Sequence, residues 1–164
     1  MSNRKPKAVI YDLDGTLADV SPHLHLVDPR HPEFIAVNLD LFHELAESAQ
    51  PHQWAIEMAN LHWTLGWQIV IMTARSERYR AQTTRWLQAH GIRFDSLHMR
   101  ADDDLSVDTL CKSRTLDQIQ VNFDVQIAVD DNPYVLALLK ERGIRTIVAP
   151  GWPHDPALEE IVAN

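Results

Sequence analysis

Two aspartates one residue apart, Asp12 and Asp14, directly follow a short apolar run near the start of the sequence, and Gly15 and Thr16 come next. In an extended segment, residues i and i+2 point to the same side, so the two carboxylates can converge on one small space. Two acids at close range repel each other and need a cation, a shared proton or both. An aspartate can also act as a nucleophile that forms an aspartyl-phosphate. The pattern indicates either a reactive acidic site or an acidic turn after a buried strand.

Length and composition restrict the class of protein. The 164 residues suit one domain with a sizeable core, and 45% hydrophobic and 23% charged residues are ordinary for a soluble globular protein. No apolar run approaches the roughly 20 residues of a membrane-spanning helix, and no signal-peptide stretch precedes Asp12, so we expect a cytoplasmic protein without membrane association. The single cysteine, Cys111, excludes a disulfide framework and a cysteine-built zinc site. A net charge of −8 gives no global attraction for nucleic acid but allows a local basic groove.

Five short apolar runs predict β-strands, and the segments between them carry helical signals. Strands that alternate with helices predict a parallel sheet, and continuous apolar strands fit a sheet covered on both faces. We therefore expect an α/β fold with a three-layer, doubly wound, Rossmann-like parallel sheet. The strands are expected at residues 8–12, 68–73, 96–99, 126–130 and 145–148, and the helices at residues 76–90, 112–121 and 133–142.

The stretch from residue 19 to residue 66 has no clear strand pattern. It begins as a proline-rich loop and continues with two helical segments, near residues 33–48 and 51–65. We expect residues 1–164 to form one domain with a small helical insert at about residues 19–66, and residues 150–164 to pack on its surface. The loop also contains three histidines whose irregular spacing is not typical of a metal site: His23, His25 and His31.

Polar residues follow three of the predicted strands. They are, in chain order, Asp12, Asp14, Thr73, Asp130 and Asp131. In open α/β sheets, ligands bind outside the carboxyl ends of the strands, where the strand order reverses. If the second and third strands lie on one side of the first strand, and the fourth and fifth on the other, Asp12 and Asp130 face each other at that point.

These residues, together with Lys112, occur in an order and a strand-end context that resemble the four motifs of the haloacid dehalogenase superfamily of phosphotransferases. The resemblance covers nearly the whole chain. A closer resemblance, over roughly residues 7–150, is to the 3′-phosphatase domain of phage polynucleotide kinase-phosphatases. It is carried by segments 67–75, 99–104 and 123–131 and by Tyr79, Arg80, Asp108, Lys112 and Asp117.

The superfamily resemblance implies a phosphomonoesterase that works through a covalent aspartyl-phosphate. It implies that Asp12 is the nucleophile, and that Asp14 is the general acid for the leaving oxygen and the general base for the hydrolytic water. It also implies a Mg²⁺ ion held by Asp12, by the backbone carbonyl of Asp14 and by Asp130, with Asp131 bound directly or through water. Oxygen ligands suit Mg²⁺ and disfavour zinc.

The resemblance further implies that the substrate phosphate contacts Thr73, Ala74 and Lys112. The Thr73 hydroxyl and the Ala74 backbone N–H are predicted at the start of a helix, whose N-terminus attracts phosphate. Lys112 would supply a positive point charge. The structural alternatives are an ordinary helix cap for Thr73 and a solvated helix lysine for Lys112.

The insert is too short to enclose a substrate fully, and an open site admits a polymer end such as a DNA or RNA 3′-terminus. Arg75, Arg78 and Arg80 are predicted on one helix, where they could form a basic strip that binds the substrate; the alternative is a solvated helix face paired with acids such as Glu77. The expected function is removal of 3′-phosphates from nucleic-acid ends. The main alternative is a small-molecule phosphatase for nucleotides or sugar phosphates, and the intact set of motif residues argues against a non-catalytic binding protein.

The sequence departs from the bifunctional phage enzymes in one respect. It has no Gly-x-x-x-x-Gly-Lys-[Ser/Thr] segment, the loop that cradles the phosphates of a kinase substrate. A kinase or a ligase would therefore be a separate partner in the repair of nucleic-acid ends.

Overall fold

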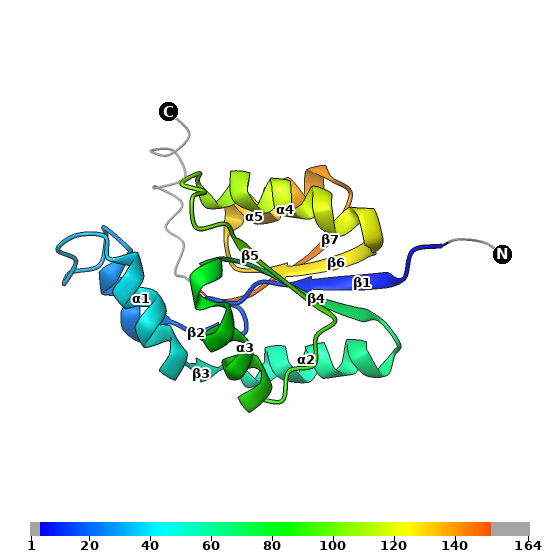
Figure 1. Ribbon diagram of the computed structural model, residues 1–164, viewed down its shortest axis with the longest axis horizontal. Coiled ribbons are helices and arrows are strands. Elements are labelled where there is room, and N and C mark those ends of the chain that lie inside the picture. The colour runs from blue at the N-terminus through cyan, green and yellow to red at the C-terminus, as the bar shows by residue number, and fades with distance from the viewer. Residues whose placement is uncertain (1–3, 152–164) are drawn as a thin grey trace.

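The computed structural model describes residues 4–151, and within this range the chain forms a five-stranded parallel sheet with helices on both faces (Figure 1). The strand order is β5-β4-β1-β6-β7, so the order reverses at β1. This confirms the predicted doubly wound α/β fold, and the strand order is the one under which Asp12 and Asp130 were expected to face each other. The strands are β1 (Lys7–Tyr11), β4 (Gln68–Ser76), β5 (Ser96–Arg100), β6 (Asp124–Asp130) and β7 (Arg145–Val148).

Helices cover the two faces of the sheet because successive residues of each strand point to opposite sides. One layer consists of α4 (Asp108–Asn122) and α5 (Pro133–Glu141), and the other of α2 (Gln53–Thr64) and α3 (Arg80–Ala89) (Figure 1). In β1, Ala8 and Ile10 pack into the core beneath α4 and α5, whereas Val9 and Tyr11 pack into the core beneath α2 and α3. Burial on both faces explains why the strands are continuous apolar runs.

The predicted insert at about residues 19–66 includes α2, which packs on the sheet, and its remaining part lies between β1 and α2. It contains the helix α1 (Leu39–Leu45), the 3₁₀ helices η1 (Ser21–Leu26) and η2 (Ala46–Ser48), and an antiparallel pair of two-residue strands, β2 (Ala18–Asp19) and β3 (Gln50–Pro51). The short strand pair was not predicted. The helix α1 begins later than the predicted helix at residues 33–48, because the Asn38 side chain accepts a hydrogen bond from the backbone N–H of Leu41 and caps the helix there.

The segment after the second long strand differs most from the prediction. The strand β4 continues to Ser76, with a shift in its register against β5. The helix predicted to begin there is instead a 3₁₀ turn, η3 (Glu77–Tyr79), followed by α3. Arg75 therefore lies in a strand, which corrects the prediction that it shares a helix with Arg78 and Arg80.

Two further predictions concern the ends of elements and of the chain. The helix α4 begins at Asp108, earlier than predicted, so Asp108 and Lys112 lie one turn apart on the same helix.

No helix formed by residues 4–151 is long and apolar enough to cross a membrane. The predicted surface packing of residues 150–164 falls, from Trp152 onward, outside the described residues.

Candidate active site

Three buried aspartates meet at the point where the strand order reverses. The backbone N–H of Asp12 donates to the Val129 carbonyl of β6 at 2.9 Å, which fixes the residue at the end of β1. Asp130 is the last residue of β6, and Asp131 follows it. One carboxylate oxygen of each aspartate lies within 4.8 Å of the others, and all three residues are at most 4% exposed. The topology thus brings together acids that are far apart in the sequence.

Lys112, from α4, bridges two of these carboxylates. Its Nζ atom lies 2.8 Å from Asp12 Oδ1 and 2.8 Å from Asp130 Oδ2, and the Asp108 carboxylate lies 3.6 Å away. Burial opposes the charge on the amine, but the carboxylates outweigh it and hold the pKa of Lys112 well above its usual value. Lys112 is 3% exposed, so the alternative of a solvated helix lysine is wrong.

The acidic cluster carries more negative than positive charge, because three carboxylates face one lysine. Burial raises the pKa of both Asp12 and Asp130, and neighbouring carboxylates raise it further, although Lys112 opposes this. A divalent cation with oxygen ligands would offset the excess negative charge. The three converging carboxylate oxygens therefore fit a hard cation such as Mg²⁺.

The Asp14 side chain pairs with Arg75. The guanidinium donates from Nε to Asp14 Oδ2 at 2.8 Å and from a terminal nitrogen to Oδ1 at 2.5 Å, and its other nitrogen lies 3.4 Å from Thr83 Oγ1. Burial opposes ionisation of Asp14, but the charge and hydrogen bonds of Arg75 outweigh it, so the pKa of Asp14 is lowered. Arg75 is 1% exposed and borders the cleft, where its two bonds to Asp14 make it an orienting residue rather than a free cation for substrate.

Thr73 and Ala74 line the same cleft as Asp12, Asp14 and Asp131. The Thr73 hydroxyl accepts a hydrogen bond from the backbone N–H of Arg75 at 3.2 Å and keeps its own proton for another acceptor. Both residues lie within β4 and not at the start of a helix, which corrects the prediction that a helix N-terminus adds to phosphate binding there. A phosphate at this position would depend on the hydroxyl, the Ala74 backbone N–H and Lys112.

Arg78 and Arg80 each pair with an acid. A terminal nitrogen of Arg78 lies 2.5 Å from Asp40 Oδ1, and Arg80 donates to both oxygens of Glu77 at 2.6 Å. The pairing with Glu77 is the alternative considered above for this basic strip. Both arginines are consequently less available to a substrate than their sequence positions indicate.

Asp12, Asp14, Thr73 and Lys112 line a cleft of about 840 Å³. Sequence reasoning missed most of its walls, which come from the insert, the loop before α4 and the start of α5. Among these residues, Asp108 had a local signal, since it lies four residues before Lys112. Residues of the cleft that were not predicted include Val27, Leu39, Phe42, His43, Leu105, Asp108 and Tyr134.

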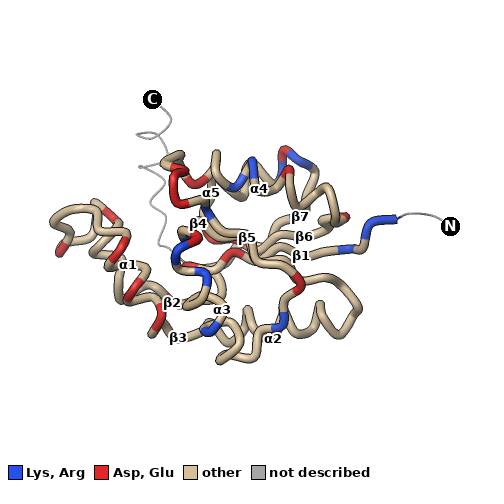
Figure 2. Tube along the Cα trace, viewed as in Figure 1, with Lys and Arg blue, Asp and Glu red and all other residues tan. Residues whose placement is uncertain are grey.

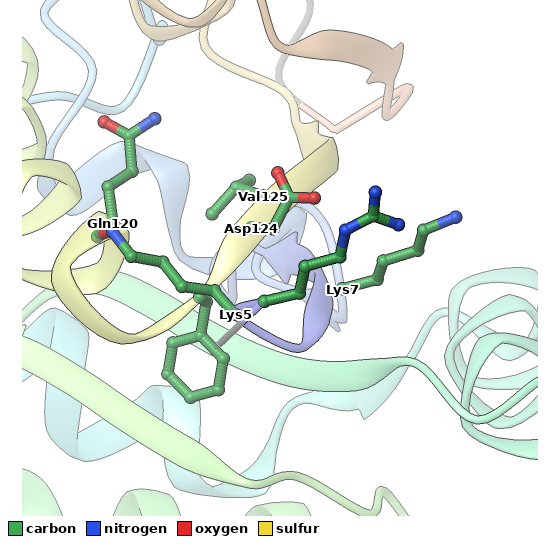
Figure 3. Close-up of a pocket in the computed structure, with 7 residues that line it drawn as sticks. Lys5, Lys7, Gln120, Asp124 and Val125 are labelled. Carbon is green, nitrogen blue, oxygen red and sulfur yellow. The ribbon is translucent and has the colours of Figure 1, made fainter. Parts of the chain in front are cut away.

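A second cleft, of about 590 Å³, lies at the opposite end of β1, beside Lys5 and Lys7 (Figure 3). The Lys5 side chain extends to the backbone carbonyl of Gln120, at 2.6 Å, and Lys7 packs over the Trp67 ring. Acidic and basic segments are interspersed at the catalytic end of the sheet, whereas the stretch at the N-terminus is basic (Figure 2). About 17 Å of strand separates this basic cleft from Asp12, so it is not part of the catalytic site.

The buried aspartates at the switch point, the lysine that bridges them and the paired Asp14 define a phosphatase of the haloacid dehalogenase type. A family model described as the phosphatase domain of polynucleotide kinase PNKP matches residues 6–151, and the chain belongs to this family. Membership indicates a phosphoric monoester hydrolase.

Solved structures agree with this assignment. A chain of the Pnkp1/Rnl/Hen1 RNA repair complex is 25% identical, with a TM-score of 0.70 over 90% of this chain; our chain spans 43% of the length of that chain. A class C acid phosphatase from Bacillus anthracis, with tungstate bound, has a TM-score of 0.64 at 13% identity. The match covers 99% of this chain and 79% of the phosphatase chain. A putative β-phosphoglucomutase from Thermotoga maritima has a TM-score of 0.57 at 17% identity, over 94% and 90% of the two chains. The last two show a shared fold.

Proposed function

We propose that the protein is a Mg²⁺-dependent phosphomonoesterase that removes 3′-phosphates from nucleic-acid ends through an aspartyl-phosphate on Asp12. The observation that supports it best is the buried cluster of Asp12, Asp130, Asp131 and Lys112 beside the Asp14–Arg75 pair. A cytoplasmic location, inferred from the composition, is part of the proposal.

In the first step, a carboxylate oxygen of Asp12 forms a bond to phosphorus while the bond between phosphorus and the 3′-oxygen breaks. The leaving oxygen takes a proton from Asp14. Because Arg75 favours the ionised form of Asp14, its contact must weaken when substrate binds, so that Asp14 can carry the proton. In the second step Asp14, again ionised, accepts a proton from a water that attacks phosphorus, and Asp12 is released.

The other residues position charge around the phosphate. Lys112 holds Asp12 in place and supplies positive charge next to the phosphoryl oxygens. Thr73 and Ala74 would donate hydrogen bonds to those oxygens. Asp12, Asp130 and the backbone carbonyl of Asp14 would hold Mg²⁺, with Asp131 directly or through water. When bound, the ion would offset the negative charge that develops on the phosphoryl group.

The nucleic-acid substrate is supported by family membership and by the similarity to a chain of an RNA repair complex. That complex also favours a DNA- or RNA-repair setting in which a separate kinase or ligase acts on the same ends. The wide cleft at the end of the sheet would admit a polymer terminus.

A second candidate, hydrolysis of free nucleotides or sugar phosphates, is favoured by the pairing of Arg78 with Asp40 and of Arg80 with Glu77. Such pairs leave little positive charge for a polymer backbone. A non-catalytic binding protein is disfavoured because the full acidic cluster, with its lysine, is in place.

A substrate panel tests the proposal. Phosphate release is measured from DNA and RNA oligonucleotides with a 3′-phosphate, from the same oligonucleotides with a 5′-phosphate, and from mononucleotides and sugar phosphates. We expect release from 3′-phosphorylated substrates that depends on Asp12. Higher kcat/KM on sugar phosphates than on any 3′-phosphorylated nucleotide would overturn the nucleic-acid assignment.

A further inference from the structure

The cations near the mouth of the cleft already have partners. Arg75 pairs with Asp14 and Arg78 pairs with Asp40, while Arg100 donates to backbone carbonyls. Arg30 also lines the cleft and pairs with Asp28, and the other carboxylates there include Asp102 and Asp104. Phosphates next to a bound 3′-end would therefore lie near carboxylates and near arginines that already have partners. Such an environment disfavours binding through the charge of a nucleic-acid backbone.

The walls of the cleft are instead apolar, and they are formed by segments that are distant in the sequence. Leu39 from α1 and Leu105 from the loop before α4 are 54% and 95% exposed, although both are large hydrophobic residues. Apolar surface of this kind beside a reactive site is typical of a ligand-binding cleft. We call this surface the apolar wall, and its residues are Val27, Leu39, Phe42, Leu105 and Tyr134.

A polar group without a partner lies within the same lining. His43 is 9% exposed, and among the described residues its Nδ1 atom has no hydrogen-bond partner. Its ring packs edge-on against Phe42 and Tyr79. Burial is the main cause of the lowered pKa of His43, and it favours the neutral ring, in which one nitrogen is a donor and the other an acceptor. An apolar wall beside one imidazole nitrogen that lacks a hydrogen-bond partner suits a flat heteroaromatic ligand with polar edges.

We propose that the apolar wall binds the nucleobase of the nucleotide that carries the scissile phosphate. This inference rests on the proposed 3′-phosphatase function and adds that recognition ends at this one nucleotide. The wall is continuous with the phosphate site, since Asp12, Thr73 and Lys112 line the same cleft. A terminal nucleotide with its phosphate at Asp12 would therefore place its sugar and base against the wall.

The inference makes two quantitative claims. Packing of a base on apolar or aromatic side chains changes affinity by about 5- to 100-fold per base, so loss of the terminal base should lower kcat/KM by a factor in that range. Loss of the flanking phosphates should change kcat/KM less than about threefold, and the reaction should depend only weakly on salt, because few counterions are released.

The experiment compares three substrates at two salt concentrations. The first is a 3′-phosphorylated oligonucleotide. The second has the same length and phosphates but ends in a tetrahydrofuran abasic residue with a 3′-phosphate, and the third is a nucleoside 3′-monophosphate. We expect the first and third to be hydrolysed with similar kcat/KM, and the abasic oligonucleotide to be at least about fivefold poorer. Leu105→Ala should reduce the ratio of base-bearing to abasic activity, whereas Leu61→Ala, an exposed leucine on α2 outside the cleft, should leave that ratio unchanged.

Two results on the parent protein would overturn the inference while leaving the 3′-phosphatase function intact. One is equal kcat/KM on the base-bearing and abasic oligonucleotides. The other is a strong preference for the oligonucleotide over the mononucleotide that disappears as salt rises. Hydrolysis of sugar phosphates with none of any 3′-phosphorylated nucleotide would overturn both the inference and the proposed function. If only the Leu105→Ala ratio failed to fall, the wall would not be the base-binding surface.

Discussion

The pair of Arg75 and Asp14 should contribute far more to stability than a surface pair of the same geometry. Arg75 is 1% exposed and makes two charged hydrogen bonds to Asp14. Removal of its side chain by Arg75→Ala would leave a largely buried carboxylate without its counter-charge. Breaking a buried pair in this way costs about 3–5 kcal/mol of the free energy of unfolding, which agrees with about 1.5–3 kcal/mol for each of two charged hydrogen bonds.

The protein contains a matched control for this substitution. Arg78 approaches Asp40 at 2.5 Å, the same nitrogen–oxygen distance as between Arg75 and Asp14, but both side chains of the Arg78 pair are more than half exposed. Solvent screens such a pair, so Arg78→Ala should cost less than about 1 kcal/mol. Arg75 makes two hydrogen bonds to Asp14 and Arg78 one to Asp40, so the difference between the two variants reports burial together with the second bond.

The measurement is denaturant-induced unfolding, in the presence of chelator, of Arg75→Ala, Arg78→Ala, Asp14→Asn and the double variant Arg75→Ala, Asp14→Asn. An uncharged Asn needs no counter-charge, so the double variant should lose at least about 2 kcal/mol less than the sum of the single changes. Equal losses for Arg75→Ala and Arg78→Ala, or strict additivity in the double variant, would refute the reasoning.

Three further predictions concern the acidic cluster and its surroundings. Chelator should abolish turnover. Added Mg²⁺ should raise the melting temperature, and Asp130→Ala should largely remove this increase because it deletes a buried ligand. A melting temperature that does not respond to Mg²⁺ would count against the metal site. Asp14→Asn should slow decay of the phosphoenzyme more than its formation from a substrate with a good leaving group, as measured by rapid quench, and unchanged decay would exclude Asp14 as the base. Gly151→Ala would place a Cβ atom 2.1 Å from the Gly15 carbonyl oxygen and 2.5 Å from Asp131 Oδ2. We expect Asp131 to shift and activity to drop by roughly tenfold, and wild-type activity in this variant would show that the contact can relax.

The sheet was predictable because its information is local. Most of the long strands are continuous apolar runs, and the polar residues after three of the strands indicate which sheet edge carries the site. The meeting of Asp12 and Asp130 followed from an assumed strand order, with the second and third strands on one side of the first and the fourth and fifth on the other, and the sheet has that order. Lys112 had both a motif position and, with Asp108, a helical spacing that indicate an acidic neighbour.

The parts that were missed depend on contacts between distant segments. Arg75 looked like a surface cation on a helix, but its burial depends on Asp14, a residue 61 positions away, which offsets the cost of removing the charge from water. The apolar wall escaped prediction because Leu39 and Leu105 belong to segments that only the fold brings to one cleft. The start of α1 was missed because a single cap at Asn38 outweighed helical propensity before it.

The most direct test of the central claim is to trap the phosphoenzyme. The protein is mixed with an oligonucleotide whose 3′-phosphate is radiolabelled, the reaction is quenched in acid within milliseconds, and the labelled peptide is identified by mass spectrometry. The account predicts one labelled residue, Asp12, with no label and no turnover in Asp12→Asn, which should remain folded. Turnover without a labelled intermediate, a label on another residue, or an active Asp12→Asn variant would contradict it.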